Sequence, residues 1–586
     1  MNVNGFLYSQ IGYDIGDPMR AIIRGGSKGY VPDGATFEVV RLSGPGAGAA
    51  QTREAPAGDG DDAATALPAG AVSYWGSTWN AHWWEIDFSG IEDPGSYSIV
   101  VTAKGKEFLK SDPIEIAKHL LWEKTVVPVA LDGMEERQRR ARNGIGWKDC
   151  GASWREANSH ATMVIALCEL VETGFEWITP QNITRIHEQI LHGLRYLAIL
   201  QDATDQTGAP DGAVIHEIPN HMDIIPGDTA KAVVAFTYAS RVLADVHPEE
   251  ASEFTDRATR AMDYLLLEAE PHSPDGFSHM THGVGPDFKV PNEFMTRDLV
   301  MMLYGCVELY VAGQVRYKQH ALRLAREIME RQVPEEKAEG GTNGDPKLWG
   351  HFYTFASSDL TEKSSCHNGF GHDTGGTFPH FLVPFAAMCR WWRDHPDVPR
   401  WQATLRRFVN GYLVPACSAN PFYLLPIGCF PGEGLLNFAG PWHGINTTFG
   451  FGAAMAAALE GYASEENRAA MRRIIVGNVQ WLCGLNAGIT RESFGGCLVW
   501  KEEVPDGEAV PYSQISGVGR RSVGNWTGIV GTIPNGFNVN PQFKFEIPAT
   551  KAVDEPRLYT DEDWIPHGAG FLAGVTAIRQ KHRFEQ

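Results

Sequence analysis

The spacing of apolar residues changes near residue 116, and this change constrains the fold of the chain more than any other feature. Before it, short runs of β-branched and aromatic residues alternate with turns rich in Gly, Pro and Asp, for example at 21–24, 37–41 and 97–101. After it, apolar residues recur every three or four positions, as in 182–201, which is the pattern of one helix face. We therefore predict two domains, a small β-sandwich at 1–115 and a helical domain at 116–586.

The helical domain contains about twelve amphipathic runs. They are predicted at 116–129, 154–173, 182–201, 228–245, 251–269, 295–313, 317–332, 378–394, 399–413, 448–462, 465–483 and 566–580. Long connections of the kind that usually carries function lie between them, at 205–227, 334–377, 414–447 and 484–565. Taken in pairs, these helices most simply close into an (α/α)6 toroid whose loops build a cleft at one end. A plain α-solenoid is the alternative, although its loops would be shorter.

The net charge and the cysteines of the chain limit the binding partners and the cellular compartment that we expect for the protein. The formal net charge of −21 argues against nucleic acid or an anionic membrane as a partner, because both need basic patches. No apolar run approaches the ~20 residues of a membrane span. The N-terminal residues 1–8 lack the basic and apolar regions of a secretory signal, and the 9 cysteines are scattered without a CxxC pair. We therefore expect buried, reduced thiols and a cytoplasmic protein.

The segment 558–571 is the most concentrated chemical feature of the chain. It places three carboxylates, a Trp and a His directly before an apolar helix, and Pro566 marks the first turn of that helix. Glu562 can thus be held rigidly beside aromatic surface, which suits a carboxylic acid whose pKa is raised for proton donation. The alternative interpretation is a solvated acidic loop.

A second concentrated segment, 146–160, precedes the helix of 161–172. It holds two carboxylates, Asp149 and Glu156, together with two tryptophans and His160. Aromatic rings can stack on sugars, and carboxylates on either side of a glycosidic bond supply an acid and a base. The alternative is a helix N-terminus whose acidic residues complement the helix dipole.

Five segments in order resemble glycoside hydrolase family 9, in the group that carries an N-terminal immunoglobulin-like domain. They lie at 9–13, 84–97, 480–486, 531–536 and 562–567, so that the likeness spans nearly the whole chain. The resemblance implies an Ig-like β-sandwich at 1–115, followed by an (α/α)6-barrel catalytic domain at 116–586 that cleaves O-glycosyl bonds.

The resemblance also implies roles for individual residues. The general acid of the family falls on Glu562, and Trp564 and His567 would flank the sugar-binding cleft. Arg520 and Arg521 lie where the family often carries a His-Arg substrate contact, so that either could bind a hydroxyl or carboxylate of the substrate. For the two arginines, an exposed loop charge is the alternative.

The usual Asp-Ala-Gly-Asp motif of the family, whose second Asp is the general base, is absent. In one alignment Asp149 and Trp154 match a longer form of the motif, Glu156 replaces its first Asp, and Ser159 or His160 stands at the base. A shorter alignment places Asp149 on the first Asp and Ala152 on the base. The usual basic Asp is missing in both.

An inverting mechanism needs a second carboxylate roughly 6.5–9.5 Å from the acid, where it activates a water molecule. The candidates are Glu156, which we favour, Asp149, and His160 acting as a neutral imidazole base.

Other candidate substrate contacts share a polar tip beside aromatic surface; they are Trp154, Arg155, His372, Asp373, Trp442 and His443. The segment 367–373 also has some likeness to a metal site, but its spacing does not ensure convergence of the ligands, and substrate contact is the favoured interpretation. We predict no catalytic metal and no required cofactor. A structural calcium ion stays open, because loop oxygens leave little trace in a sequence.

The predicted function is hydrolysis of an imported β-linked oligosaccharide, with exo-action favoured and a homodimer among the open oligomeric states. Two alternatives remain. A polysaccharide lyase or sugar epimerase on the same toroid could use His160, His372, Arg520 and Arg521 on a uronate. A non-catalytic relative could bind glycans through its Trp-rich cleft.

Overall fold

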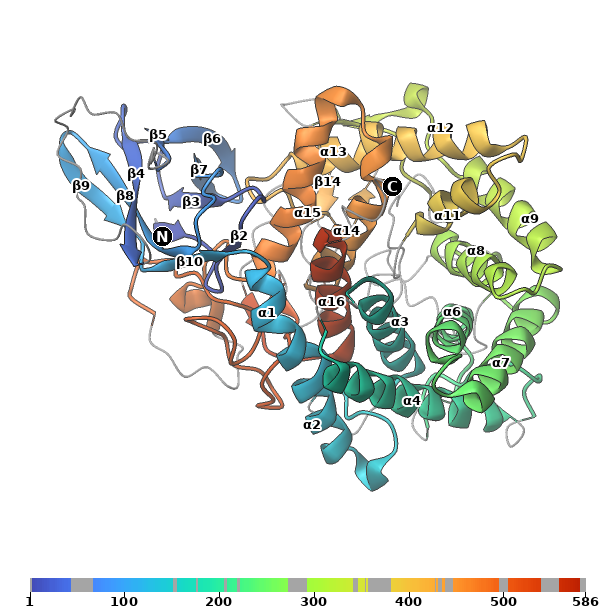
Figure 1. The fold of residues 1–586 in the computed structure, drawn as a ribbon. Helices are drawn as coiled ribbons and strands as arrows, with labels where there is room; N and C mark the ends of the chain where they lie inside the picture. The colour runs from blue at the N-terminus through green and yellow to red at the C-terminus, as the bar shows by residue number, and fades with distance from the viewer. Residues whose placement is uncertain are drawn as a thin grey trace, which may run out of the picture.

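The computed structural model consists of a β-rich N-terminal domain beside a larger helical domain (Figure 1). The described residues are 3–43, 67–150, 155–174, 178–204, 208–218, 222–271, 292–340, 346–353, 355–356, 381–426, 428–430, 435–437, 446–494, 504–538 and 558–579.

Two sheets form the N-terminal domain. One has the order β1 (Gly5–Leu7), β3 (Arg20–Gly25), β7 (Ala81–Asp87) and β6 (Ser73–Thr78). The other has the order β2 (Tyr13–Asp14), β10 (Ile114–Ala117), β8 (Gly95–Ala103), β4 (Thr36–Ser43) and β5 (Ala69–Ala71), and β9 (Lys106–Lys110) also pairs with β8. All of these pairs are antiparallel except β2 with β10. The predicted strand runs all fall within these strands.

The central strands β3 and β7 of the first sheet are buried on both faces, which joins the two domains. Side chains of a strand alternate between faces, so that Ile23 and Trp84 enter the core between the sheets. Their neighbours Ile22 and Trp83 enter the core of the helical domain, where the Trp83 ring meets Phe422 edge-on with centroids 5.3 Å apart. The sandwich is therefore part of the packing of the helical domain.

Helices make up the second domain. They are α1 (Leu120–Val127), α2 (Gly133–Arg140), α3 (Ala157–Gly174), α4 (Pro180–Asp202), α6 (Pro226–Leu243), α7 (Pro248–Leu267), α8 (Thr296–Val311), α9 (Tyr317–Glu330), α11 (Val383–Trp391), α12 (Val398–Phe408), α13 (Val414–Cys417), α14 (Asn446–Leu459), α15 (Arg468–Leu482) and α16 (Ile565–Arg579). Short connections between them form 3-10 or π turns, and β11 (Glu339–Gly340) to β16 (Leu558–Thr560) are strands of two or three residues.

Each predicted helical run contains an observed helix, with two corrections. Residues 116–117 end β10 and the first helix begins at Leu120, so that the predicted boundary between 115 and 116 falls inside the last strand of the sandwich. Helix α2 was not predicted, because its sequence is strongly polar; it is held by the tertiary contacts of Arg137, which is buried.

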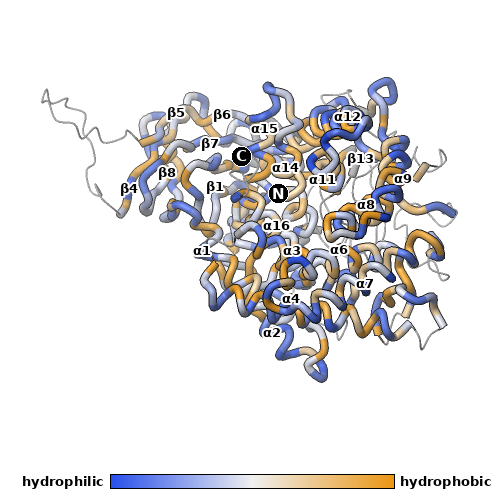
Figure 2. Tube along the Cα trace, turned by 45° about the vertical axis from the view of Figure 1, so that its right-hand side comes forward, coloured by the Kyte–Doolittle hydropathy of each residue, from blue (hydrophilic) through white to orange (hydrophobic). Residues whose placement is uncertain are grey.

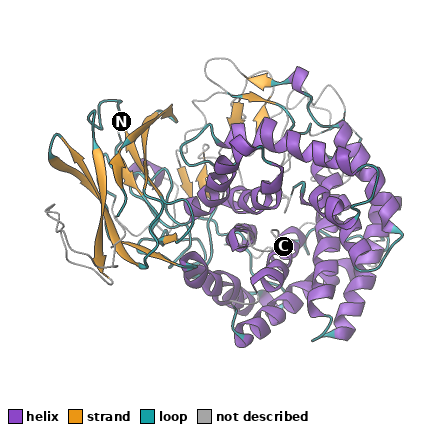
Figure 3. Cartoon of the chain, turned by 45° about the horizontal axis from the view of Figure 1, so that its top comes forward, coloured by secondary structure: helices purple, strands orange, loops and turns teal. Residues whose placement is uncertain are grey.

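Six helices among the described residues close a ring (Figures 1 and 3). In order around the ring they are α3, α6, α8, α11, α14 and α16, and α16 packs against α3 again. Each has an outer partner: α4, α7, α9, α12, α15 and, for α16, α1. An open solenoid would leave its first and last helices apart, so that this alternative is wrong.

The sequences of the inner and outer helices differ as their positions require. Outer helix α9 buries one stripe of side chains, whereas inner helix α14 is buried along most of its length. Figure 2 shows the mixed hydropathy of outer helices such as α12. Glycines allow α14 and α16 to touch, since a Cβ on Gly450 would lie 2.2 Å from the backbone carbon of Gly570.

None of the described helices has the length and apolar character that a bilayer crossing requires. Of the cysteines in the described part of the chain, Cys168, Cys306, Cys417 and Cys483 are buried free thiols, and the free thiol of Cys389 is half-buried.

Candidate active site

Polar side chains gather at one end of the ring, although they are buried. Inner and outer helices alternate along the chain, so that all inner helices begin at the same end. Their first turns carry buried polar residues, among them Asn158 and Ser159 on α3, Asp228 on α6, Arg297 on α8, Thr447 on α14 and His567 on α16. The positive ends of several helix dipoles therefore face a common region, a setting that favours anionic groups.

Glu562 lies in this region, between β16 and the start of α16. Strand β16 pairs with β15 (Gly536–Asn538), which places Asn535 beside Glu562. The Asn535 backbone N–H donates to the Glu562 carbonyl oxygen at 2.7 Å, and its side-chain amide donates to Glu562 Oε2 at 3.3 Å. Asn535 thus fixes both the backbone and the carboxyl group of Glu562.

His567 holds Asn535 in turn. Its Nε2 lies 2.6 Å from Asn535 Oδ1, and Thr447 hydrogen-bonds to its Nδ1. Because an amide oxygen only accepts, Nε2 carries the proton, and the Asn535 NH2 group must face Glu562. His567 is fully buried, and burial lowers its pKa to about 3. The predicted role at the sugar-binding surface is therefore wrong for His567, which positions Glu562 from behind.

The pKa of Glu562 is raised above its usual value. Burial is the largest cause, and the charges of Asp149 and Asp561 add to it, whereas hydrogen bonds from Asn535 and Trp564 oppose it. Trp564 is half-buried, so that part of its ring stays accessible near the carboxyl group. A carboxyl group that stays protonated to higher pH is suited to donating a proton near neutrality.

Asp149 is held at both of its oxygens. The backbone N–H of Ile565, at the start of α16, donates to Oδ1 at 3.1 Å, and the Ser159 hydroxyl donates to Oδ2 at 3.2 Å. Burial raises the pKa of Asp149 to about 6, and the Arg137 charge opposes this shift. Ile565 lies three residues after Glu562, so that its hydrogen bond to Asp149 joins the segment 558–571 to the segment 146–160.

Glu156 lies on the other side of Ser159. The Ser159 hydroxyl is 3.4 Å from Glu156 Oε2, so that one hydroxyl faces both carboxyl groups. Burial raises the pKa of Glu156 well above its usual value, the charges of Asp149, Asp228 and Glu217 add to this, and His216 opposes it. Two neighbouring carboxyl groups of this kind resist ionising together.

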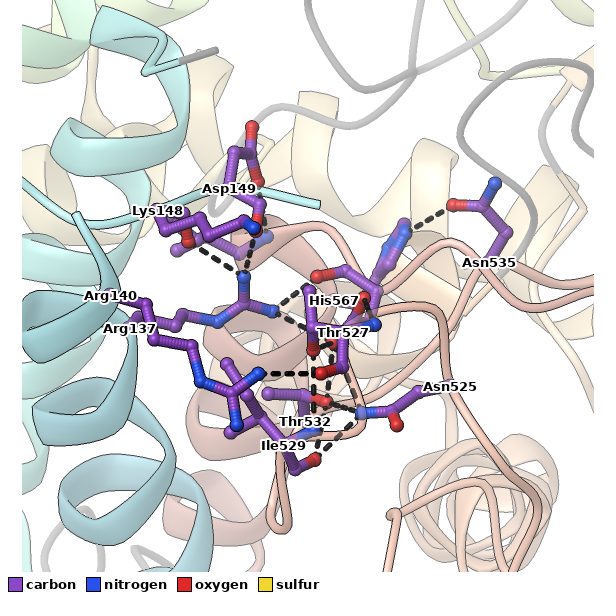
Figure 4. Close-up of polar contacts among 12 residues, drawn as sticks. Arg137, Arg140, Lys148, Asp149, Asn525, Thr527, Ile529, Thr532, Asn535 and His567 are labelled. Atoms are coloured by element: carbon purple, nitrogen blue, oxygen red, sulfur yellow. Dashed lines mark hydrogen bonds and ion pairs between the residues drawn. The ribbon is translucent and has the colours of Figure 1, made fainter. Parts of the chain in front are cut away.

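Arg137 joins the loops that carry Asp149 and Glu562 (Figure 4). Its Nη1 donates to the backbone oxygens of Lys148 at 2.9 Å and Asp149 at 2.5 Å. Its Nη2 hydrogen-bonds to the backbone oxygen of Asp563 and lies 3.5 Å from Asp563 Oδ2. Both side chains are buried. The two acidic loops are therefore fixed relative to each other by one guanidinium.

Hydroxyl and amide groups complete the environment of Asp563. Thr532 donates to its Oδ2 at 2.7 Å, Asn525 donates at 3.1 Å, and Thr527 bonds to both oxygens. Asp563 is thus a buried structural carboxylate, whereas Glu562, the residue before it, is only half-buried.

The structure contradicts the prediction that His160 could act as a base. Its Nε2 accepts the backbone N–H of Trp147 at 2.8 Å, and its Nδ1 lies 2.8 Å from the carbonyl oxygen of Glu156, to which it donates. The ring also stacks on Trp147 at 5.0 Å between centroids, and burial lowers the pKa of His160 to about 3. The lone pair that a base would need is already used.

The predicted arginines lie elsewhere. Arg520 and Arg521 face Asp112 of the sandwich, at 3.1 and 3.7 Å, and both remain partly exposed. Arg155 donates to the backbone oxygen of Ile145 at 2.6 Å and stacks over Tyr196. These contacts, made among the described residues, do not reach the carboxyl cluster, so that substrate binding by Arg155, Arg520 and Arg521 stays a prediction.

Five predicted contacts lie outside the described residues: Trp154, His372, Asp373, Trp442 and His443. Conversely, the sequence interpretation missed Arg137, His216, Asp228 and Asn535. Asn535 stands in one of the segments that carry the family resemblance, so that this segment was the available signal. The other three had no local signal. Within the described part of the chain, no three His, Cys, Asp or Glu side chains are grouped to hold a metal ion, and the calcium question stays open.

Comparisons with known proteins bear on the fold. No protein-family model matches the chain, and no curated protein is found as a relative. Solved structures do match over nearly the full length. A single-mutant form of the thermostable endoglucanase from Alicyclobacillus acidocaldarius has a TM-score of 0.61 at 15% identity, covering 98% of this chain and 99% of that one.

Two further matches are similar. A metagenome-derived family 9 endoglucanase has a TM-score of 0.54 at 16% identity, covering 98% of both chains. A family 9 glycoside hydrolase of Bacteroides ovatus has a TM-score of 0.57 at 12% identity, again covering 98% of both. The chain therefore has the fold of the family 9 glycoside hydrolases, as the resemblance in its sequence implied.

Proposed function

We propose that the protein is a glycoside hydrolase built on an (α/α)6 toroid with an Ig-like cap, and that it cleaves a β-linked oligosaccharide with Glu562 as the general acid. One observation carries the proposal: the half-buried Glu562, whose pKa is raised, stands before the last inner helix, and two further carboxyl groups, Asp149 and Glu156, both face the Ser159 hydroxyl on the first inner helix. That the similar structures are endoglucanases favours a β-glucan as the substrate class.

Glu562 would transfer its proton to the glycosidic oxygen as the bond from that oxygen to the anomeric carbon breaks. The Asn535 amide donates a hydrogen bond to the carboxyl group, which stabilises the carboxylate left after proton transfer. Because His567 sets the direction of the Asn535 amide, the carboxyl plane is fixed before the substrate arrives.

Water would attack the anomeric carbon from the opposite face and lose its proton to a second carboxylate, which inverts the configuration. Glu156 is the favoured base. Both oxygens of Asp149 already accept hydrogen bonds. Because Ser159 has one hydroxyl proton and donates it to Asp149, Glu156 Oε2 faces the oxygen of that hydroxyl at 3.4 Å without receiving the proton. Asp149 and Ser159 would then orient Glu156 and the water.

Exo-action on a soluble oligosaccharide in the cytoplasm is the finer form of this proposal. The long segments between helices could close the cleft into a pocket, and the buried unpaired thiols fit a reducing compartment. A time course of products decides the mode of action, since exo-action releases one product size from the start, whereas endo-action releases a mixture.

The lyase alternative loses support at three of the four residues it depends on; the fourth, His372, lies outside the described residues. Its base His160 is engaged at both ring nitrogens, and its uronate-binding candidates Arg520 and Arg521 face Asp112.

Product analysis by mass spectrometry tests the proposed function. Wild type, Glu562→Gln and the exposed control Glu249→Gln are incubated with neutral and acidic β-linked oligosaccharides. The proposal expects products that gain one water, formed by wild type and the control and lost with Glu562→Gln. Unsaturated products without added water would place the enzyme among lyases, and binding without turnover would leave a glycan-binding protein.

A further inference from the structure

A buried histidine–carboxylate pair stands behind Glu156. His216 Nδ1 lies 2.5 Å from Asp228 Oδ2, and neither side chain is exposed. Asp228 is on the first turn of α6, and His216 precedes that helix in a connection held to it by the 3.2 Å bond from the Val214 N–H to Thr229 Oγ1. A buried pair of this kind is costly to keep unless it is well bonded, so that its placement needs a reason.

The pair is joined to the segment that carries Glu156. The backbone N–H of Ala157, the next residue, donates to the His216 carbonyl oxygen at 2.8 Å, and the His216 N–H donates to the Asp223 carbonyl oxygen at 2.8 Å. Burial raises the pKa of Glu156 overall, and His216 is the group that most opposes this rise. His216 is thus fixed by its ring nitrogen, its carbonyl oxygen and its backbone N–H, and it lies close to the candidate base Glu156.

The acidic neighbours of Glu156 oppose its ionisation. Besides His216, the titratable groups near Glu156 are Asp149, Glu217, Asp228 and Tyr196. Lys231, one turn after Asp228, donates instead to Asn158 Oδ1 at 2.6 Å. Without a positive partner, a carboxyl group among so many acids would stay protonated and could not accept a proton from water.

We propose that His216, held by Asp228, is the positioning residue that favours ionisation of Glu156 and orients it as the water-activating base. This inference rests on the proposed hydrolase function. Asp228 holds the proton on Nδ1 and stabilises the imidazolium form, and the imidazolium in turn stabilises the Glu156 carboxylate. The assembly supplies what the missing Asp of the family motif would otherwise provide, through a residue of a different helix pair.

The test compares His216→Asn and Asp228→Asn with wild type. The Asn side chain keeps a donor near the position of Nδ1 but carries no charge. A β-glucoside with a dinitrophenyl leaving group is the substrate, because its departure needs little acid catalysis and isolates the base. We expect the acidic limb of the kcat profile to move to higher pH by about one unit or more, which is about a tenfold loss below that limb. Activity should recover at higher pH, and KM should change little.

A buried histidine away from the cluster provides the control. His351 is fully buried against Tyr412, with ring centroids 4.9 Å apart, and His351→Asn should lower stability without moving the limb. If the His216 and Asp228 variants lose activity equally at all pH values, the pair is only structural and the inference is wrong.

An infrared titration separates this inference from the hydrolase proposal, because it requires no turnover. The carboxyl band that disappears in Glu156→Gln is followed with pH in wild type and in His216→Asn. A higher midpoint in His216→Asn supports the inference even if the oligosaccharides are not cleaved, and an unchanged midpoint overturns it even if they are.

Discussion

Asn535 donates two hydrogen bonds to Glu562, from its backbone N–H to the carbonyl oxygen at 2.7 Å and from its side-chain amide to Oε2 at 3.3 Å. The second contact has a fixed direction because His567 donates to the amide oxygen. The acid is therefore held by a chain of three side chains that runs back into the first turns of α14 and α16.

Replacing Asn535 by Ala should lower kcat by about 10²-fold, since a small misplacement of a catalytic group has effects of that size. KM should change less, because the amide holds Glu562 and not the substrate. Steady-state kinetics on a β-glucan oligosaccharide measure both values. A rise in KM with kcat unchanged would show that Asn535 binds substrate and does not orient the acid.

The pH profile of kcat should be bell-shaped and displaced upward from the ordinary range of carboxyl groups. The rate rises with pH as the water-activating carboxyl group ionises, and it falls as Glu562 loses its proton. Because burial raises the pKa of Asp149 to about 6 and that of Glu156 well above its usual value, the acidic limb should lie near or above pH 6 and not near 4. The two limbs report the coupled carboxyl groups jointly. An acidic limb close to pH 4 would contradict the burial of the base.

Asp149→Asn should stabilise the fold at neutral pH. The folded-state pKa of about 6 lies above the usual 3.8, so that the folded protein gives up this proton less readily than the unfolded chain, and stability is lost as pH rises between these values. Removing the charge should recover up to about 3 kcal/mol at pH 7, less whatever the new amide loses in hydrogen bonding to Ile565 and Ser159.

Urea denaturation at pH 7 and at pH 4 measures this difference. The advantage of Asp149→Asn should be present at pH 7 and largely lost near pH 4, where the wild-type carboxyl group is protonated in the folded protein and about half protonated in the unfolded chain. A variant that is equally destabilised at both pH values would mean that Asp149 is held as a favourable carboxylate.

Arg137→Met should destabilise the protein by about 3 kcal/mol or more, because it leaves the buried Asp563 without its cation and two loops without their common donor. The matched control is Arg491→Met, which breaks an exposed pair with Asp506 and should cost less than about 1 kcal/mol. Chemical denaturation of both variants checks the contrast, and equal small effects would show that the Arg137 contacts do not fix the loops.

Much of the fold was predictable because periodic burial leaves a periodic sequence. The run that begins near Ile183 and Ile186 became α4, and the apolar residues after Pro566 became α16. Helix α2 was missed because tertiary contacts of Arg137, not an apolar stripe, hold it in place. The start of the helical domain was placed too early because the alternation of β10 is too short to distinguish from a helix.

The sequence indicated which residue types gather at the candidate site, but not which way their side chains point. Glu562, Asp149 and Glu156 were recognised because carboxyl groups beside aromatic residues before a helix are unusual. His160 and His567 belong to the same segments, yet both point into the packed interior, and a sequence does not show which way a side chain turns. His216 and Asp228 come from a connection and a helix with no motif of their own, and the packing of the consecutive inner helices α3 and α6 brings them to Glu156.

The central claim is that Glu562 protonates the leaving group, and paired substrates test it most directly. Kinetics of Glu562→Gln are measured on cellotetraose, whose leaving group needs a proton, and on a dinitrophenyl β-cellobioside, whose leaving group does not. The account predicts a loss of about 10²–10⁴-fold or more on cellotetraose and a far smaller loss on the dinitrophenyl substrate. Equal losses on both substrates, or full activity on cellotetraose, would contradict it.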